Sequence, residues 1–134
     1  MAELSKLMKI VLGINILAAF IYGILYLLIP EIYGSLIDTP AFDAHFWRLW
    51  GGTCLSLGVF GILGIIRNDW SRFGVFMEFV IIWLLITNLL NLASFGYLNR
   101  SLTNAISELI DVIVIFIIIA LDLYAIIQEN KKSD

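Results

Sequence analysis

The stretch that decides the fold is ELIDVIVIFIIIALDLYAII, residues 108–127, an almost unbroken run of apolar side chains. A helix of about 20 residues is about 30 Å long, which matches the hydrocarbon core of a bilayer. The run nevertheless carries the carboxylates Glu108, Asp111 and Asp122. An ionised acid inside a span costs about 2.5–3.5 kcal/mol on insertion scales, so such acids are expected to face protein, a partner or water.

The composition of the whole chain indicates the same class of protein. Of the 134 residues, 61% are hydrophobic and only 14% are charged, whereas a soluble domain has about 25% charged residues. Apolar runs lie at about 10–29, 47–66, 73–95 and 106–127. The sequence therefore predicts an all-α integral membrane protein, a four-helix bundle formed by a single domain over residues 1–134.

The segments that connect the apolar runs predict a short helix and a tight turn. The longest is PEIYGSLIDTPAFDAHF, residues 30–46, which is too polar to cross a membrane. Its apolar side chains predict a short amphipathic helix in the membrane interface. These side chains are Ile32, Tyr33, Leu36 and Ile37. Asn68 and Asp69 mark a tight turn, which predicts that the second and third spans are antiparallel neighbours.

The basic residues predict the orientation in the membrane. The side that holds both termini carries Lys6, Lys9, Arg67, Arg72, Lys131 and Lys132, and the other side carries Arg48 and Arg100. Because Lys and Arg accumulate in cytoplasmic segments, both termini are expected in the cytoplasm. The expected location is a cell membrane that the chain crosses several times, of the prokaryotic cytoplasmic type.

Helical geometry places the acids of the fourth span on one face. Asp111 and Asp122 are eleven residues apart, which brings them within about 20° of each other on a helix. Glu108 lies about 60° to one side of Asp111, and Glu129 returns to the same line. A lipid-facing helix excludes acids, so this stripe is expected to face the bundle interior or a partner.

One candidate site lies toward the outer side of the membrane. Arg48 ends the second span at about the depth of Glu108 and Asp111, and a pair with either acid would lower the cost of burying both. The alternative is an arginine that reaches the outer headgroups. The residues expected at this outer solute or ion site are Arg48, Glu108, Asp111, Asn88, Asn91 and Tyr26.

A second candidate site lies in the inner half. Glu78 and Asp122 are expected at one level, together with Asn15 of the first span. No basic residue of the same core can neutralise the two acids, so one of them is expected to stay protonated. The alternative is that Arg72 or Lys131 reaches them from the membrane surface. Asn15, Tyr22 and Tyr26 are seven and four residues apart and form a polar seam on one face of the first span, for which the alternative is ordinary packing in the core.

Small residues follow one face of the second span, namely Gly51, Cys54, Gly58 and Gly61. Such residues let helices approach closely in lipid, so this face predicts helix packing, with backbone lining of a cavity as the alternative. The lone Cys54 is interpreted as one of these small residues and not as a nucleophile, since no histidine is near it in depth.

Several chemistries are excluded. His45 is the only histidine and Cys54 the only cysteine, which rules out a bis-histidine haem, an HExxH motif and a cysteine-rich metal site within one chain. The net charge of -3, with eight basic residues, gives no basic surface for nucleic acid. We therefore predict no cofactor, no metal and no catalytic residues, and an enzyme is less expected than a binding protein.

Two segments carry a resemblance to a known family. The first span ends in IPEIYG, residues 29–34, and an arginine followed by glycines comes in RLWGGTCLSLGVFGIL, residues 48–63. With two more apolar spans, this pattern resembles the small four-helix membrane proteins called DoxX-like. The resemblance implies the fold more than an activity, because some relatives are linked to quinone-dependent sulfur oxidation and others to membrane-protein assembly. This chain departs from the DoxX-like family in two features, its single cysteine and a second span without acids. Both features argue against a redox role.

Two functions follow as expectations. The first is a bundle that binds or conducts a small solute or cation through a polar, carboxylate-lined interior. The second is an accessory or assembly protein whose acidic fourth span docks a partner helix bearing Lys or Arg. The lipid bilayer is an expected partner in both cases, a homo-oligomer or a partner membrane protein is compatible with them, and nucleic acid is not expected.

Overall fold

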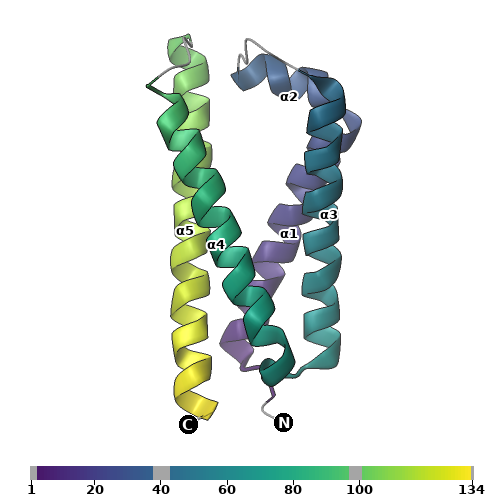
Figure 1. Cartoon of the computed structure of the whole chain (residues 1–134), viewed down its shortest axis with the longest axis vertical. Helices are drawn as coiled ribbons and strands as arrows, with labels where there is room; N and C mark the ends of the chain where they lie inside the picture. The colour runs from purple at the N-terminus through teal and green to yellow at the C-terminus, as the bar shows by residue number, and fades with distance from the viewer. Residues whose placement is uncertain (1–2, 38–42, 97–100, 134) are drawn as a thin grey trace.

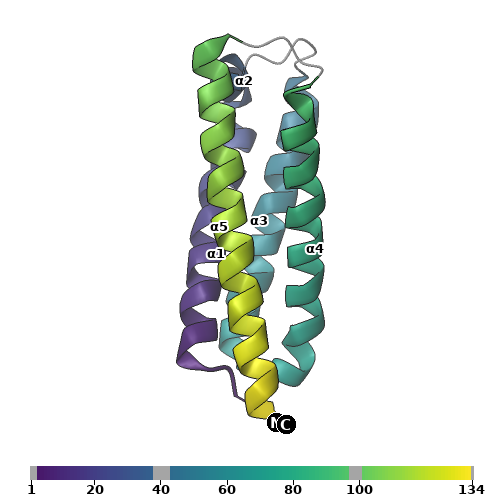
Figure 2. The ribbon, with the colours of Figure 1, turned by 90° about the vertical axis from the view of Figure 1, so that its left-hand side faces the viewer.

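A computed structural model describes residues 3–37, 43–96 and 101–133 of the chain. In these ranges the chain forms five α-helices, α1 (Lys6–Leu28), α2 (Pro30–Ile37), α3 (Ala44–Arg67), α4 (Trp70–Ser94) and α5 (Leu102–Ser133). The four long helices run along one common direction, and the short α2 lies crosswise at one end (Figure 1). Both chain termini lie at the opposite end (Figure 2). We call these ends the α2 end and the terminal end.

Helices α1, α3, α4 and α5 are each long and apolar enough to cross a membrane. Each of them overlaps one of the four apolar runs, so the prediction of an all-helical bundle with four membrane-length helices is confirmed. Large hydrophobic side chains remain exposed along their outer faces, as at Leu17, Phe60, Ile82 and Ile117. Such a surface suits lipid, because hydrocarbon chains solvate these side chains and water does not.

The helices begin and end at residues that satisfy their free backbone groups. The side chains of Ser5, Asp43 and Asp69 accept hydrogen bonds from the first turns of α1, α3 and α4. Asn68 ends α3 with a φ of 50°, a left-handed conformation that asparagine adopts more readily than most residues. The tight turn predicted at Asn68 and Asp69 is therefore present, and it sends α4 back antiparallel to α3.

Helices α1 and α3 form the closest packed pair, through small residues. A methyl group added at Gly51 would lie 2.8 Å from the Gly23 carbonyl oxygen, which is backbone of α1. One added at Gly61 would lie 2.7 Å from a side-chain carbon of Ile16. Gly58 and Cys54 are also buried in α3. The face predicted for helix packing thus lies at the contact with α1.

Helix α4 packs against α5, and α1 also contacts α5. The α1–α3 pair and the α4–α5 pair are close together at the terminal end and diverge toward the α2 end (Figure 1). Aromatic rings bridge α3 and α4, with centroids 5.4 Å apart for Phe60 and Phe76 and 5.6 Å for Trp50 and Trp83. The second and third spans are therefore neighbours that meet through long side chains more than through close backbone contact.

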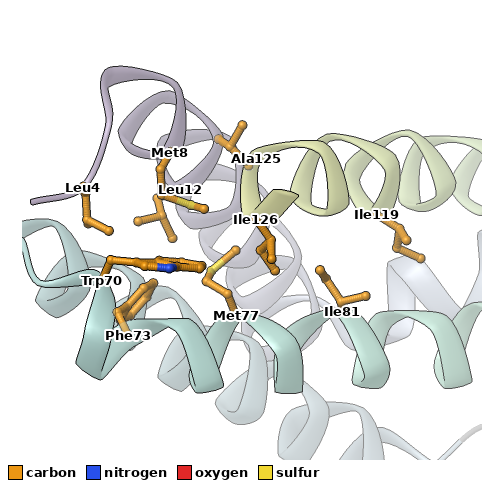
Figure 3. Close-up of a cluster of buried hydrophobic side chains, with 11 residues drawn as sticks. Leu4, Met8, Leu12, Trp70, Phe73, Met77, Ile81, Ile119, Ala125 and Ile126 are labelled. Atoms are coloured by element: carbon orange, nitrogen blue, oxygen red, sulfur yellow. The ribbon is translucent and has the colours of Figure 1, made fainter. Parts of the chain in front are cut away.

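The buried hydrophobic core fills the terminal half of the bundle. Met8 and Leu12 of α1 meet Trp70 and Met77 of α4, and Ile126 of α5 lies beside them (Figure 3). Each of these side chains is almost fully buried. Burying such a side chain stabilises the fold by about 1.5–3 kcal/mol relative to exposure in water, and inside lipid the gain comes from packing instead.

Hydrogen bonds between helices also stabilise the terminal end. Glu129 near the end of α5 accepts a 2.7 Å hydrogen bond from the backbone N–H of Ser5, which precedes α1. The indole N–H of Trp70, at the start of α4, donates to Asn130 Oδ1 at 3.1 Å. The terminal end is thus held by apolar packing and by hydrogen bonds between helices.

Helix α2 corresponds to the short helix predicted in the first connection. It begins at Pro30, a residue favoured in the first turn because its ring presets the helical φ. Ile32 is exposed whereas Tyr33 turns toward the bundle and is half-buried. The side chains of Leu36 and Ile37, residues 38–42 and Arg100 lie outside the described part of the chain. Helix α2 contacts α1, α3 and α5, and these contacts place it over the end of the bundle.

Candidate functional site

A cavity of about 500 Å³ lies between the four long helices, on the α2 side of the buried core. All five helices contribute to its walls. The aromatic residues among those that line it are Tyr22, Tyr26, Tyr33, Phe46, Trp47, Trp50, Phe76 and Trp83. The two helix pairs diverge toward this end (Figure 1), and α2 contacts α1, α3 and α5 there.

Apart from the aromatic side chains, the polar residues that line the cavity are few, and they come from α1, α4 and α5. They include Asn15, Thr87, Asn91, Ser94, Glu108 and Asp111. The charged ones, Glu108 and Asp111, lie one turn apart on α5. An apolar cavity with a small number of fixed polar groups is the usual form of a small-molecule site.

Asp111 is held by two tyrosines. Its Oδ1 accepts a 2.9 Å hydrogen bond from the Tyr22 hydroxyl group, and its Oδ2 accepts a 2.7 Å bond from the Tyr33 hydroxyl group. Burial raises the pKa of the Tyr33 phenol, so this hydroxyl group keeps its proton and acts as a donor. The carboxyl group is therefore fixed in position by neutral donors from α1 and α2.

Tyr26 lies at the centre of an aromatic cluster next to this carboxyl group. Its ring centroid is 5.8 Å from that of Tyr22, 4.8 Å from that of Tyr33 and 5.0 Å from that of Trp47. Edge and tilted contacts of this kind are favourable, because the positive edge of one ring meets the negative face of another. The cluster joins α1, α2 and α3 into one aromatic wall of the cavity.

Asn15 lines the cavity and also contacts Asp122. The Asn15 amide donates to Asp122 Oδ1 at 2.6 Å and to the Val11 carbonyl at 3.0 Å. Asp122 is fully buried, and its Oδ2 has no hydrogen-bond partner among the described residues. The predicted meeting of these two residues at one level is observed, but Asp122 does not itself line the cavity.

Asn88 and Asn91, predicted at the outer site, have different positions. Asn91 lines the cavity. Asn88 is fully buried, and its amide donates to the Val112 carbonyl of α5 at 3.1 Å. Asn88 therefore connects α4 to α5, and it is not among the residues that line the cavity.

The acid stripe of α5 faces the interior of the bundle. Glu108, Asp122 and Glu129 are 6%, 0% and 1% exposed. Asp111 contacts α1 and α2 through its two hydrogen bonds. The sequence left open whether these acids face the bundle interior or a partner. In the structure they face the bundle interior.

The expected pair between Arg48 and an acid of α5 is wrong. Arg48 Nη2 lies 3.1 Å from Glu31 Oε1, and both side chains are about half exposed. Glu31 follows Pro30 at the start of α2, a segment that the sequence placed in the interface without giving its acid a partner. Arg48 therefore lies at the exposed surface of the α2 end and does not neutralise Asp111.

The expected inner pair of Glu78 and Asp122 is also wrong. Glu78 is exposed on α4, whereas its neighbour Met77 points into the core. The partner of Asp122 is Asn15, from a different helix. The sequence did not predict the direction in which α4 turns Glu78.

Sequence reasoning missed several residues of the site, namely Tyr33, Trp47, Trp50 and Trp83. A signal for some of them was present. Trp47 and Trp50 are three residues apart at the start of the second span, a spacing that puts both on one helix face. Aromatic residues near span ends are usually attributed to the membrane interface, which hides an inward-facing set.

Comparison of the chain with protein-family models, with curated proteins and with solved structures gave no match. The resemblance to DoxX-like proteins therefore stays a prediction, and the interpretation of the site rests on its geometry.

Proposed function

We propose that this protein binds a small solute inside a transmembrane four-helix bundle. The observation that carries the proposal is the cavity of about 500 Å³ between the helices, a volume within the range of about 300–1,000 Å³ that is usual for small-molecule sites. Its mostly apolar walls suit an organic molecule. Its few polar groups suit the recognition of one part of that molecule.

The two halves of the bundle differ in a way that supports binding from one end. The terminal half is filled by the buried core and fastened by the Ser5–Glu129 and Trp70–Asn130 hydrogen bonds. The cavity lies on the other side of this core, under α2. We therefore propose that the solute enters from the α2 end, and that conduction across the membrane would require the terminal half to open.

Docking of a partner helix through the acidic fourth span receives less support. That function needs the acid stripe of α5 on an outer face, whereas Asp122 and Glu129 are buried within the chain. An assembly role, an oligomer and a DoxX-like relationship stay compatible with the fold, and none of them accounts for the cavity.

Orientation and location complete the proposal. The basic residues at the terminal end, including Arg67 and Arg72, favour a cytoplasmic position for both termini. The solute would then enter from the outer face of a prokaryotic cytoplasmic membrane.

The test fills the cavity without changing its charge. Ala18 lines the cavity, and Ala120 is exposed on α5 outside it. The purified protein in lipid nanodiscs is screened by thermal shift against neutral and charged organic compounds of about 150–300 Da. The affinity of each hit is then measured by tryptophan fluorescence, because Trp47 and Trp50 line the cavity. Ala18→Phe should abolish binding, and Ala120→Phe should retain it. Absence of any ligand, or equal binding by both variants, would contradict the proposal.

A further inference from the structure

The charge of the cavity wall restricts what kind of solute it can take. Among the described residues that line it, the charged side chains are Glu108 and Asp111, and none is Lys, Arg or His. Arg48, the nearest candidate from sequence, pairs instead with Glu31 at the surface. The part of the wall around Asp111 therefore repels anions and attracts cations, and this effect is stronger in an apolar interior than in water.

Asp111 provides the negative charge at a fixed position. Both of its hydrogen-bond partners, Tyr22 and Tyr33, are neutral donors, and it forms no ion pair with another described residue. Hydrogen bonds from neutral donors orient a carboxylate and leave its net charge uncompensated. A cationic group beside Asp111 would supply that compensation, because an opposite charge lowers the cost of burying a carboxylate.

The aromatic wall supplies a second attraction for cations. The rings of Tyr22, Tyr26, Tyr33 and Trp47 form one connected cluster that lines the cavity on three helices. Tyrosine and tryptophan rings attract cations through their negative faces by about 0.5–2 kcal/mol each, most strongly for weakly hydrated groups such as quaternary ammonium. This attraction operates beside the same carboxylate that favours positive charge.

From these two features we infer that the solute is a monovalent organic cation, with an amine or quaternary ammonium group beside Asp111 and an apolar body against the remaining walls. The inference rests on the proposed function, since it names the chemical class of the bound solute. A bare metal ion fits less well, because it requires several oxygen ligands in place of its water shell. The surrounding walls are mostly apolar and offer few further oxygen ligands beside Asp111.

The experiment compares three probes of nearly the same shape and different charge. They are benzyltrimethylammonium, the neutral neopentylbenzene and the anionic phenylmethanesulfonate. Binding to the full-length protein is measured in phosphatidylcholine nanodiscs, whose lipid has no net charge, with empty nanodiscs subtracted. The cation should bind at least about tenfold more tightly than the neutral probe, and the anion should bind more weakly than either.

Variants assign the preference to the site. Asp111→Asn keeps the size of the side chain and removes its charge, so the cation should lose about tenfold in affinity while the neutral probe is unchanged. Tyr26→Leu, which keeps all charges, should weaken the cation more than the neutral probe. Glu78→Gln is the matched control, because this acid is exposed outside the cavity and its removal should change neither affinity.

The outcomes separate this inference from the proposed function. Equal binding of the cation and the neutral probe, both blocked by Ala18→Phe, would overturn the cation inference and leave solute binding in place. Binding of Na⁺, K⁺ or Mg²⁺ that depends on Asp111, without binding of the organic probe, would assign an inorganic ion and also overturn it. Failure of all three probes would overturn the inference, and the compound screen with the Ala18→Phe and Ala120→Phe pair would judge solute binding independently.

Discussion

The hydroxyl group of Tyr33 lies 2.7 Å from Asp111 Oδ2 and donates a hydrogen bond to it. This bond joins the short crosswise helix α2 to the acid-bearing face of α5, two segments that are far apart in the sequence. This hydrogen bond fixes the carboxyl group of Asp111 at the cavity wall and holds α2 over the end of the bundle. Its loss should therefore be measurable in both stability and ligand binding.

We expect Tyr33→Phe to lower the free energy of unfolding by about 1–3 kcal/mol, because it removes a hydrogen bond to a charged group and keeps the ring. Tyr124 is exposed on α5, so Tyr124→Phe is the matched control and should change stability little. Thermal unfolding in detergent, followed by circular dichroism, measures both. Equal melting temperatures for the two variants would contradict the role of the Tyr33 hydroxyl group.

Arg48→Ala should have a small effect. The ion pair with Glu31 is about half exposed on both sides, and exposed pairs contribute about 0.2–1 kcal/mol. Glu31→Ala should give a similar small change, and the double variant should add little to either. A loss of several kcal/mol for Arg48→Ala alone would indicate a buried charge pair, which is the arrangement that the sequence first suggested and the structure does not have.

Two neighbouring glycines of α3, Gly51 and Gly52, should respond differently to replacement by alanine. At Gly51 an added Cβ would lie 2.8 Å from the Gly23 carbonyl oxygen and 2.9 Å from the Leu27 backbone nitrogen, and at Gly52 nothing lies within 4 Å. Gly51→Ala must separate α1 from α3 and should cost about 1–3 kcal/mol. Gly52→Ala should be neutral or stabilise the helix by up to about 1 kcal/mol. Unfolding by denaturant compares the two, and similar effects would argue against close α1–α3 packing.

The bond between Asn15 and Asp122 gives a fourth test. Asn15→Ala leaves a fully buried carboxyl group without its 2.6 Å hydrogen bond and should cost about 1–3 kcal/mol. Asp122→Asn should keep stability close to the parent, because the amide retains an acceptor for Asn15 and no described cation loses a partner. Thermal unfolding compares the stability of both variants with that of the parent protein. An equally large loss for Asp122→Asn would show that the fold requires the charge of this group.

Some features of the candidate site could be predicted from the sequence and others could not. The inward orientation of the α5 stripe was among the alternatives, because acids on one helical face avoid lipid. The contact of Asn15 with Asp122 followed from their similar depth. The pairing of Arg48 and the direction of Glu78 were predicted incorrectly, because depth along a span says nothing about how a helix is rotated about its axis.

What the sequence by itself determined are properties of single segments. The length of each apolar run sets a membrane-crossing helix, the 100° step between residues places Asp111 and Asp122 on one face, and the turn at Asn68 and Asp69 reverses the chain. Each of these depends on residues close together in the chain. They could therefore be predicted without knowing where any other helix lies.

What only the tertiary structure decided are the relations between segments. The α1–α3 pair diverges from the α4–α5 pair (Figure 1), and residues of all five helices together line the cavity. The position of α2 brings Tyr33 to Asp111, while Arg48 pairs with Glu31. These relations depend on the tilt, rotation and relative depth of whole helices. Packing of many side chains at once sets those quantities, with close contact where glycines allow it and separation where large aromatic rings intervene.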